Sequence, residues 1–81
     1  MEFSRALDAL MVEVHSGSLD GVRTFTETLD PHRVRPVLES AVLIGFKEGA
    51  SFAIISWMAG RIGTLRVSQT PYGATRLVRC T

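Results

Sequence analysis

The side chains that could do acid–base chemistry are few and far apart in the sequence. His15 and His32 are the only histidines, and neither stands at a spacing typical of a base paired with a nucleophile. Ser16 follows His15, but adjacency in sequence does not make a catalytic pair. A cationic residue near a helix end is the simpler interpretation of His15, and an exposed loop residue that of His32. We therefore expect no catalytic site and no enzyme.

Metal, cofactor and disulfide chemistry also lack a recognisable pattern. Cys80 is the only cysteine, so no disulfide can form within the chain, which fits a reducing cytoplasm. We interpret Cys80 as a small buried hydrophobic residue. No paired Cys or His spacing indicates a metal site, and the glycines of residues 60–63 match neither a phosphate loop nor a dinucleotide fingerprint. We expect no metal and no cofactor.

The charges are segregated along the chain. Residues 1–40 hold four arginines and seven acids, net −3, whereas residues 41–81 hold five basic residues and one acid, net +4. Arginine outnumbers lysine eight to one, which is typical of GC-rich bacterial or phage genomes, and arginine also suits bidentate contacts. The longest uncharged stretch, residues 49–60, spans 12 residues, which is too short to cross a membrane. The N-terminus does not have the pattern of a signal peptide.

The expected fold is organised around residues 51–58, Ser-Phe-Ala-Ile-Ile-Ser-Trp-Met. Alternate positions are apolar on both faces, which favours the central strand of a sheet. Residues 2–15 instead repeat apolar side chains every three or four positions, which predicts an amphipathic helix.

Two segments allow two interpretations. Alternating threonines in residues 22–29 favour a strand, although Ser18 could instead cap a helix there. β-branched residues favour a strand at about 40–47, although Asp30 could cap a helix at 31–46. Pro36 limits regular pairing near it to an edge or a loop.

The C-terminal segments at 62–69 and 74–80 predict a hairpin around Thr70-Pro71-Tyr72-Gly73, whose proline and glycine suit a type I turn. With Thr70 opposite Gly73, one row is buried: Leu65, Val67, Val78 and Cys80. The other row forms a basic outer face: Thr64, Arg66, Leu77 and Arg79.

These elements predict one α+β domain over residues 1–81, with an N-terminal helix packed on an antiparallel meander of four or five strands. The alternative is two or three N-terminal helices followed by a three-stranded meander.

A hydrophobic content of 46% leaves apolar surface for a partner. We expect a non-enzymatic cytoplasmic protein-binding module: an adaptor or inhibitor of a larger protein, of phage or bacterial origin, forming a homodimer and not entering a membrane. The predicted contact residues are Arg66, Tyr72, Arg76 and Arg79, because interfaces favour Tyr and Arg. The alternative is a nucleic-acid-binding regulator that uses the same hairpin.

Overall fold

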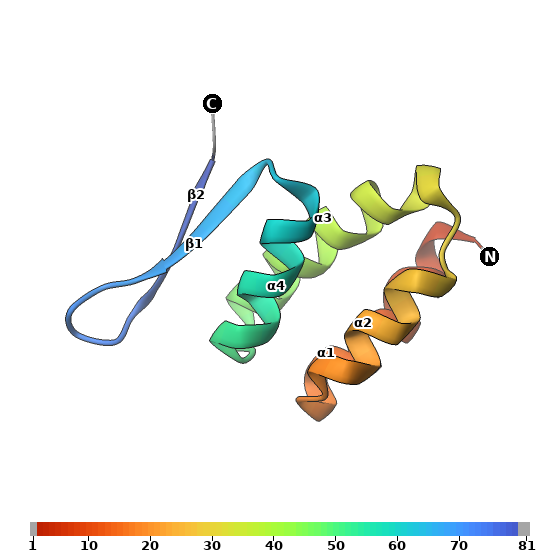
Figure 1. Cartoon of the computed structure of the whole chain (residues 1–81). Coiled ribbons are helices and arrows are strands. Elements are labelled where there is room, and N and C mark those ends of the chain that lie inside the picture. Colours follow the sequence, from red (N-terminus) through yellow and green to blue (C-terminus); the bar gives the residue numbers. More distant parts are fainter. Residues whose placement is uncertain (1, 80–81) are drawn as a thin grey trace.

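The computed structural model describes residues 2–79, and the expectation for Cys80 lies outside this range. Four helices precede a single hairpin. Their bounds are α1, Phe3–Ser16; α2, Leu19–Thr28; α3, Pro31–Lys47; α4, Phe52–Ile62; β1, Leu65–Gln69; and β2, Thr75–Arg79. Figure 1 shows the helices gathered at the right and the hairpin projecting to the left.

The first helix forms where the sequence predicts it. Its buried residues, Ala6, Leu10, Met11 and Val14, recur at the helical period. The second helix begins at Ser18, whose Oγ accepts a hydrogen bond from the backbone N–H of Gly21 at 2.9 Å. Val22 and Thr26 are buried on its inner face. The strand expected at 22–29 is therefore wrong, because the Ser18 cap and the burial of one helical face outweigh the strand preference of the threonines.

The third and fourth helices bury residues at identical spacings. In α3 the buried positions are Val37, Leu38, Ala41, Val42 and Gly45. In α4 they are Ile54, Ile55, Met58, Ala59 and Ile62. Each set covers a broad helical face, and the two helices pack against each other. The strand expected at 40–47 is wrong, and the helix starting after Asp30 is what forms.

The expected central strand at 51–58 is also wrong, because this segment belongs to α4. Over eight mostly apolar residues, a strand and a buried helix fit equally well. A helix can be distinguished from a strand only over the longer segment that ends at Ile62. There Ala53, Gly60 and Arg61 are exposed, so one face of a helix is polar or open to solvent. Gly63, with φ of 74°, ends the helix.

The core lies between the helices rather than between a helix and a sheet. α3 packs against both α1 and α4, and α2 packs against α1. The largest fully buried side chains come from all four helices and include Leu10, Val22, Leu38 and Met58. The predicted four- or five-stranded meander is therefore wrong, and so is the alternative with three strands, because residues 2–79 form a sheet of only two strands.

Candidate functional site: the C-terminal hairpin

The loop of the hairpin contains a type I turn followed by one extra residue. Gly73 N–H donates to the carbonyl oxygen of Thr70 at 2.9 Å, as the turn requires. Thr70 N–H then donates to the carbonyl oxygen of Ala74 at 2.8 Å. Gly73 has φ of 83°, a conformation that favours glycine and adds a residue to the second strand. Thr70 therefore lies opposite Ala74 and not opposite Gly73.

This extra residue shifts the pairing of the strands by one position relative to the sequence-based expectation. Arg66 lies opposite Val78, Val67 opposite Leu77, and Leu65 opposite Arg79. Because side chains alternate between faces, a shift of one exchanges the two faces of β2. Leu77 turns inward and Val78 turns outward, the reverse of the expected arrangement.

The inner face of the hairpin joins it to the helices. Leu65, Val67 and Leu77 are partly buried and pack against the hydrophobic core, and β1 contacts α4 directly. An isolated two-stranded hairpin is marginally stable in water. Contact with α4 therefore holds this hairpin in place.

The outer face brings together two of the four predicted contact residues. Arg66 and Arg76 lie on this face with Ser68 and Val78, since Arg66 pairs with Val78 and Ser68 pairs with Arg76. Both arginines are exposed, and Val78 is 47% exposed. Arg66 and Arg76 are diagonal neighbours, and residues in such a pair lie about 7–8 Å apart. One bidentate acidic group, or two neighbouring carboxylates, could contact both arginines.

The other two predicted residues lie apart from this pair. Tyr72 is at the tip of the hairpin and is 96% exposed, so its ring does not fold back onto its own strands. Arg79 belongs to the opposite face and lines a groove of about 440 Å³. The same groove is lined by Glu39 and Leu43 of α3 and by Thr64, whose hydroxyl donates to Glu39 Oε1 at 3.5 Å.

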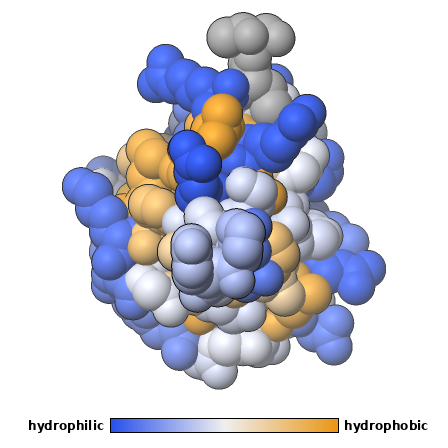
Figure 2. Space-filling view, turned by 90° about the vertical axis from the view of Figure 1, so that its left-hand side faces the viewer, coloured by the Kyte–Doolittle hydropathy of each residue, from blue (hydrophilic) through white to orange (hydrophobic). Residues whose placement is uncertain are grey.

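The charged residues of the hairpin are all arginines. Residues 49–81 include four arginines and no aspartate or glutamate. Within residues 2–79, Arg66, Arg76 and Arg79 have no carboxylate within ion-pair distance. Figure 2, which looks onto the hairpin end of the molecule, shows hydrophilic side chains standing out around smaller areas of apolar surface. This end of the molecule presents positive charge beside exposed apolar groups.

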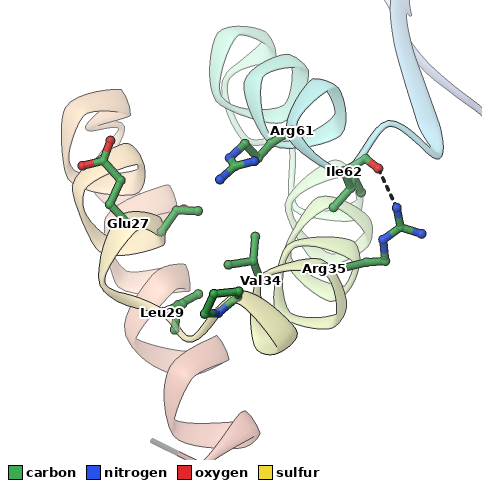
Figure 3. Close-up of a pocket in the computed structure, with 8 residues that line it drawn as sticks. Glu27, Leu29, Val34, Arg35, Arg61 and Ile62 are labelled. Atoms are coloured by element: carbon green, nitrogen blue, oxygen red, sulfur yellow. Dashed lines mark hydrogen bonds between the residues drawn. The ribbon is translucent and has the colours of Figure 1, made fainter.

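A second hollow lies between the C-terminal end of α4, the end of α2 and the start of α3. It has a volume of about 470 Å³ and is lined by Thr26, Glu27, Leu29, Pro31, Val34, Arg35, Arg61 and Ile62. Figure 3 shows Arg61 and Val34 facing the hollow, with Glu27 on the side of α2. Arg35 turns aside and donates from Nη2 to the carbonyl oxygen of Ile62 at 3.4 Å. Charges of both signs line this hollow.

The histidines lie in surface positions. His15 Nε2 is 3.0 Å from Glu48 Oε2 and joins the end of α1 to the end of α3. His32 is exposed in the first turn of α3 rather than in a loop. Among the residues that the structure describes, no three His, Cys, Asp or Glu side chains gather closely enough to hold a metal ion. In the same residues, no helix has the length and apolar character needed to cross a membrane.

The sequence patterns did not predict two features of the hairpin. The outward turn of Val78 depends on the extra residue at Gly73, and the position of Glu39 beside Arg79 depends on how α3 packs. The φ preference of glycine is a local signal for the first, whereas no local signal indicates the second. Comparisons with family models, with curated proteins and with solved structures gave no match.

Proposed function

We propose that this chain is a small non-enzymatic protein-binding module that acts as an adaptor or inhibitor of a larger protein. The observation that carries the proposal is the pair Arg66 and Arg76 on the outer face of a projecting hairpin, next to exposed Val78. Interfaces favour arginine and aromatic residues around apolar contacts. Tyr72 at the tip supplies an exposed aromatic group.

The wider setting that we propose follows from composition. A single cysteine suits the cytoplasm, and the arginine bias suits a phage or bacterial accessory protein. The homodimer expected from the apolar content would use the helical body, where Val12 and Leu43 are exposed.

A nucleic-acid-binding regulator is the second candidate, because Arg66 and Arg76 share the exposed outer face of the hairpin and residues 49–81 contain no aspartate or glutamate. Phosphate contacts would use the same outer face. Stacking on single strands needs several aromatic rings near the charges, and Tyr72 is the only aromatic residue in the two strands and their loop. The scarcity of aromatic rings makes protein binding the better supported function.

The test is a pull-down from cell lysate with the tagged full chain, divided into nuclease-treated and untreated halves. We expect a stoichiometric protein that survives nuclease treatment. Its recovery should fall about tenfold or more in the double variant Arg66→Glu and Arg76→Glu, because attractive contacts become repulsive. The matched control, Arg5→Glu with Arg23→Glu, makes the same change in net charge on α1 and α2 and should retain the partner.

Two results would contradict the proposal. Equal recovery with the hairpin variant and the control would remove this face as the contact. Recovery of nucleic acid, with all protein partners lost after nuclease, would favour the regulator instead.

A further inference from the structure

The outer edge of β1 presents backbone groups without strand partners. Thr70 N–H donates to Ala74 across the hairpin, so the even-numbered residues of β1 direct their N–H and C=O groups toward β2. Leu65, Val67 and Gln69 direct theirs away from β2. In the described part of the chain, β1 has one strand neighbour, β2. A row of donors and acceptors at an open strand edge is a template for a further strand.

There is open space beside this edge. A hollow of about 270 Å³ is lined by Leu65, Arg66 and Val67 of β1 and by Ser56, Ala59, Gly60 and Gly63 of α4 and its end. None of the lining residues belongs to β2, so the hollow is formed by β1 together with α4 and its end. A Cβ atom added at Gly60 would have no heavy atom within 4 Å. A neighbouring strand would lie about 4.8 Å from β1, with alternate side chains over this hollow.

The charges near the edge select the occupant. Arg66 lines the hollow, Arg61 is exposed at the end of α4, and residues 49–79 include no carboxylate. A second copy paired along the same edge with Arg66 opposite its own counterpart would place two like charges directly opposite each other, which is destabilising. A segment with carboxylates would instead pair with Arg66.

We infer that the free edge of β1 binds an extended acidic segment of the partner protein as a third strand of the sheet. The backbone of the segment would bond to Leu65, Val67 and Gln69, as in other cases of strand addition. Its apolar side chains would lie over the hollow beside α4, and its acidic side chains would lie on the outer face next to Arg66. This inference depends on the proposed protein-binding function and specifies the chemistry of the partner.

The test uses the full chain and a fluorescently labelled peptide, Val-Glu-Val-Glu-Val-Glu-Val, of about the length of a short strand. Binding is measured by fluorescence polarisation, and amide hydrogen exchange locates it. We expect binding of this peptide but not of the matching peptide with lysine in place of glutamate. On binding, the amides of Leu65, Val67 and Gln69 should become protected.

Gly60→Leu is the decisive variant, because it places a side chain in the hollow while Arg66 and Arg76 themselves remain unchanged. We expect it to weaken peptide binding by about tenfold or more, since a side chain would occupy the place of the added strand. The fold should persist, because replacing glycine inside a helix favours the helix. The matched control is Ala53→Leu, at an exposed position of α4 two turns earlier, which should bind the peptide like the unmodified chain.

Several results would overturn the inference. These are no binding of the acidic peptide at millimolar concentration, equal binding by Gly60→Leu, or protection at Thr75, Leu77 and Arg79 of β2 instead. Protection of the β1 amides without peptide, rising with protein concentration, would identify a second copy as the occupant. If Gly60→Leu still captures the lysate partner that the arginine double variant loses, the proposed function stands and the strand-addition site fails.

Discussion

Thr70 and Ala74 form a backbone hydrogen bond of 2.8 Å, from the N–H of Thr70 to the carbonyl oxygen of Ala74. This bond fixes the pairing of the whole hairpin. Because Thr70 lies opposite Ala74, Arg66 and Arg76 share the outer face and Leu77 packs inward. The composition of the proposed contact surface therefore depends on the conformation of one glycine, Gly73.

Replacing Gly73 should weaken the hairpin. Its φ of 83° costs a residue with a Cβ atom about 1–2 kcal/mol. Gly73→Val should therefore speed amide hydrogen exchange at Arg66 and Ser68 while the helices keep their protection. Tyr72→Val, at the preceding and fully exposed position, is the control and should leave the exchange rates unchanged. Equal rates in both variants would show that Gly73 does not set the pairing.

The start of α2 should depend on Ser18. Its Oγ accepts the N–H of Gly21 at 2.9 Å, and loss of such a cap costs about 1 kcal/mol. Ser18→Ala should lower the free energy of unfolding by that amount in urea denaturation. Ser16→Ala is the matched control, because the Ser16 hydroxyl donates to the carbonyl oxygen of Glu13 at an exposed helix end. Similar losses in the two variants would argue against the cap.

Thr26 should tolerate loss of its hydroxyl alone better than loss of its hydroxyl and methyl group together. Thr26 is 2% exposed, and its Oγ1 donates to the carbonyl oxygen of Val22 at 2.8 Å. That carbonyl also accepts the helical N–H four residues later, so Thr26→Val leaves it with a partner. We expect Thr26→Val to change the free energy of unfolding by less than about 1 kcal/mol.

Thr26→Ala is the comparison for this prediction. It opens a cavity in the core and should cost about 1–2 kcal/mol. Thermal and urea unfolding of the two variants side by side measure the difference. Equal losses in Thr26→Val and Thr26→Ala would contradict the prediction, because both variants lack the hydroxyl and only Thr26→Ala loses the packing.

Removing Pro36 should stabilise α3. Pro36 lies inside the helix, where it lacks the N–H that would bond to the carbonyl oxygen of His32 and its ring crowds that carbonyl group. We expect Pro36→Ala to raise the free energy of unfolding by about 1–2 kcal/mol, less than the full penalty, because proline also restricts the unfolded chain. Pro31→Ala is the control and should give no gain, since the first helical position favours proline. An unchanged urea midpoint in Pro36→Ala would contradict this.

Local patterns predicted part of the fold and part of the candidate site. The period of Ala6, Leu10 and Val14 predicts α1, and the turn at Thr70-Pro71-Tyr72-Gly73 predicts a hairpin in the right place. The same turn predicts that Tyr72 lies at an exposed tip. Each of these features depends on side chains or backbone conformations within a few residues of one another, so local sequence patterns are enough to predict them.

Packing between distant segments decided the rest. Residues 51–58 are mostly apolar, so their pattern fits a strand as well as a helix. The helix forms because the buried faces of α3 and α4 have the same spacing and pack against each other. Pro36 opposes a helix locally, yet α3 forms through it because Val37, Leu38 and Ala41 are buried. Burial of apolar area outweighs such local preferences. Likewise, only the folded chain places Arg66 on the same face as Arg76 rather than Arg79, because the pairing of the strands determines which residues of β2 share a face with Arg66.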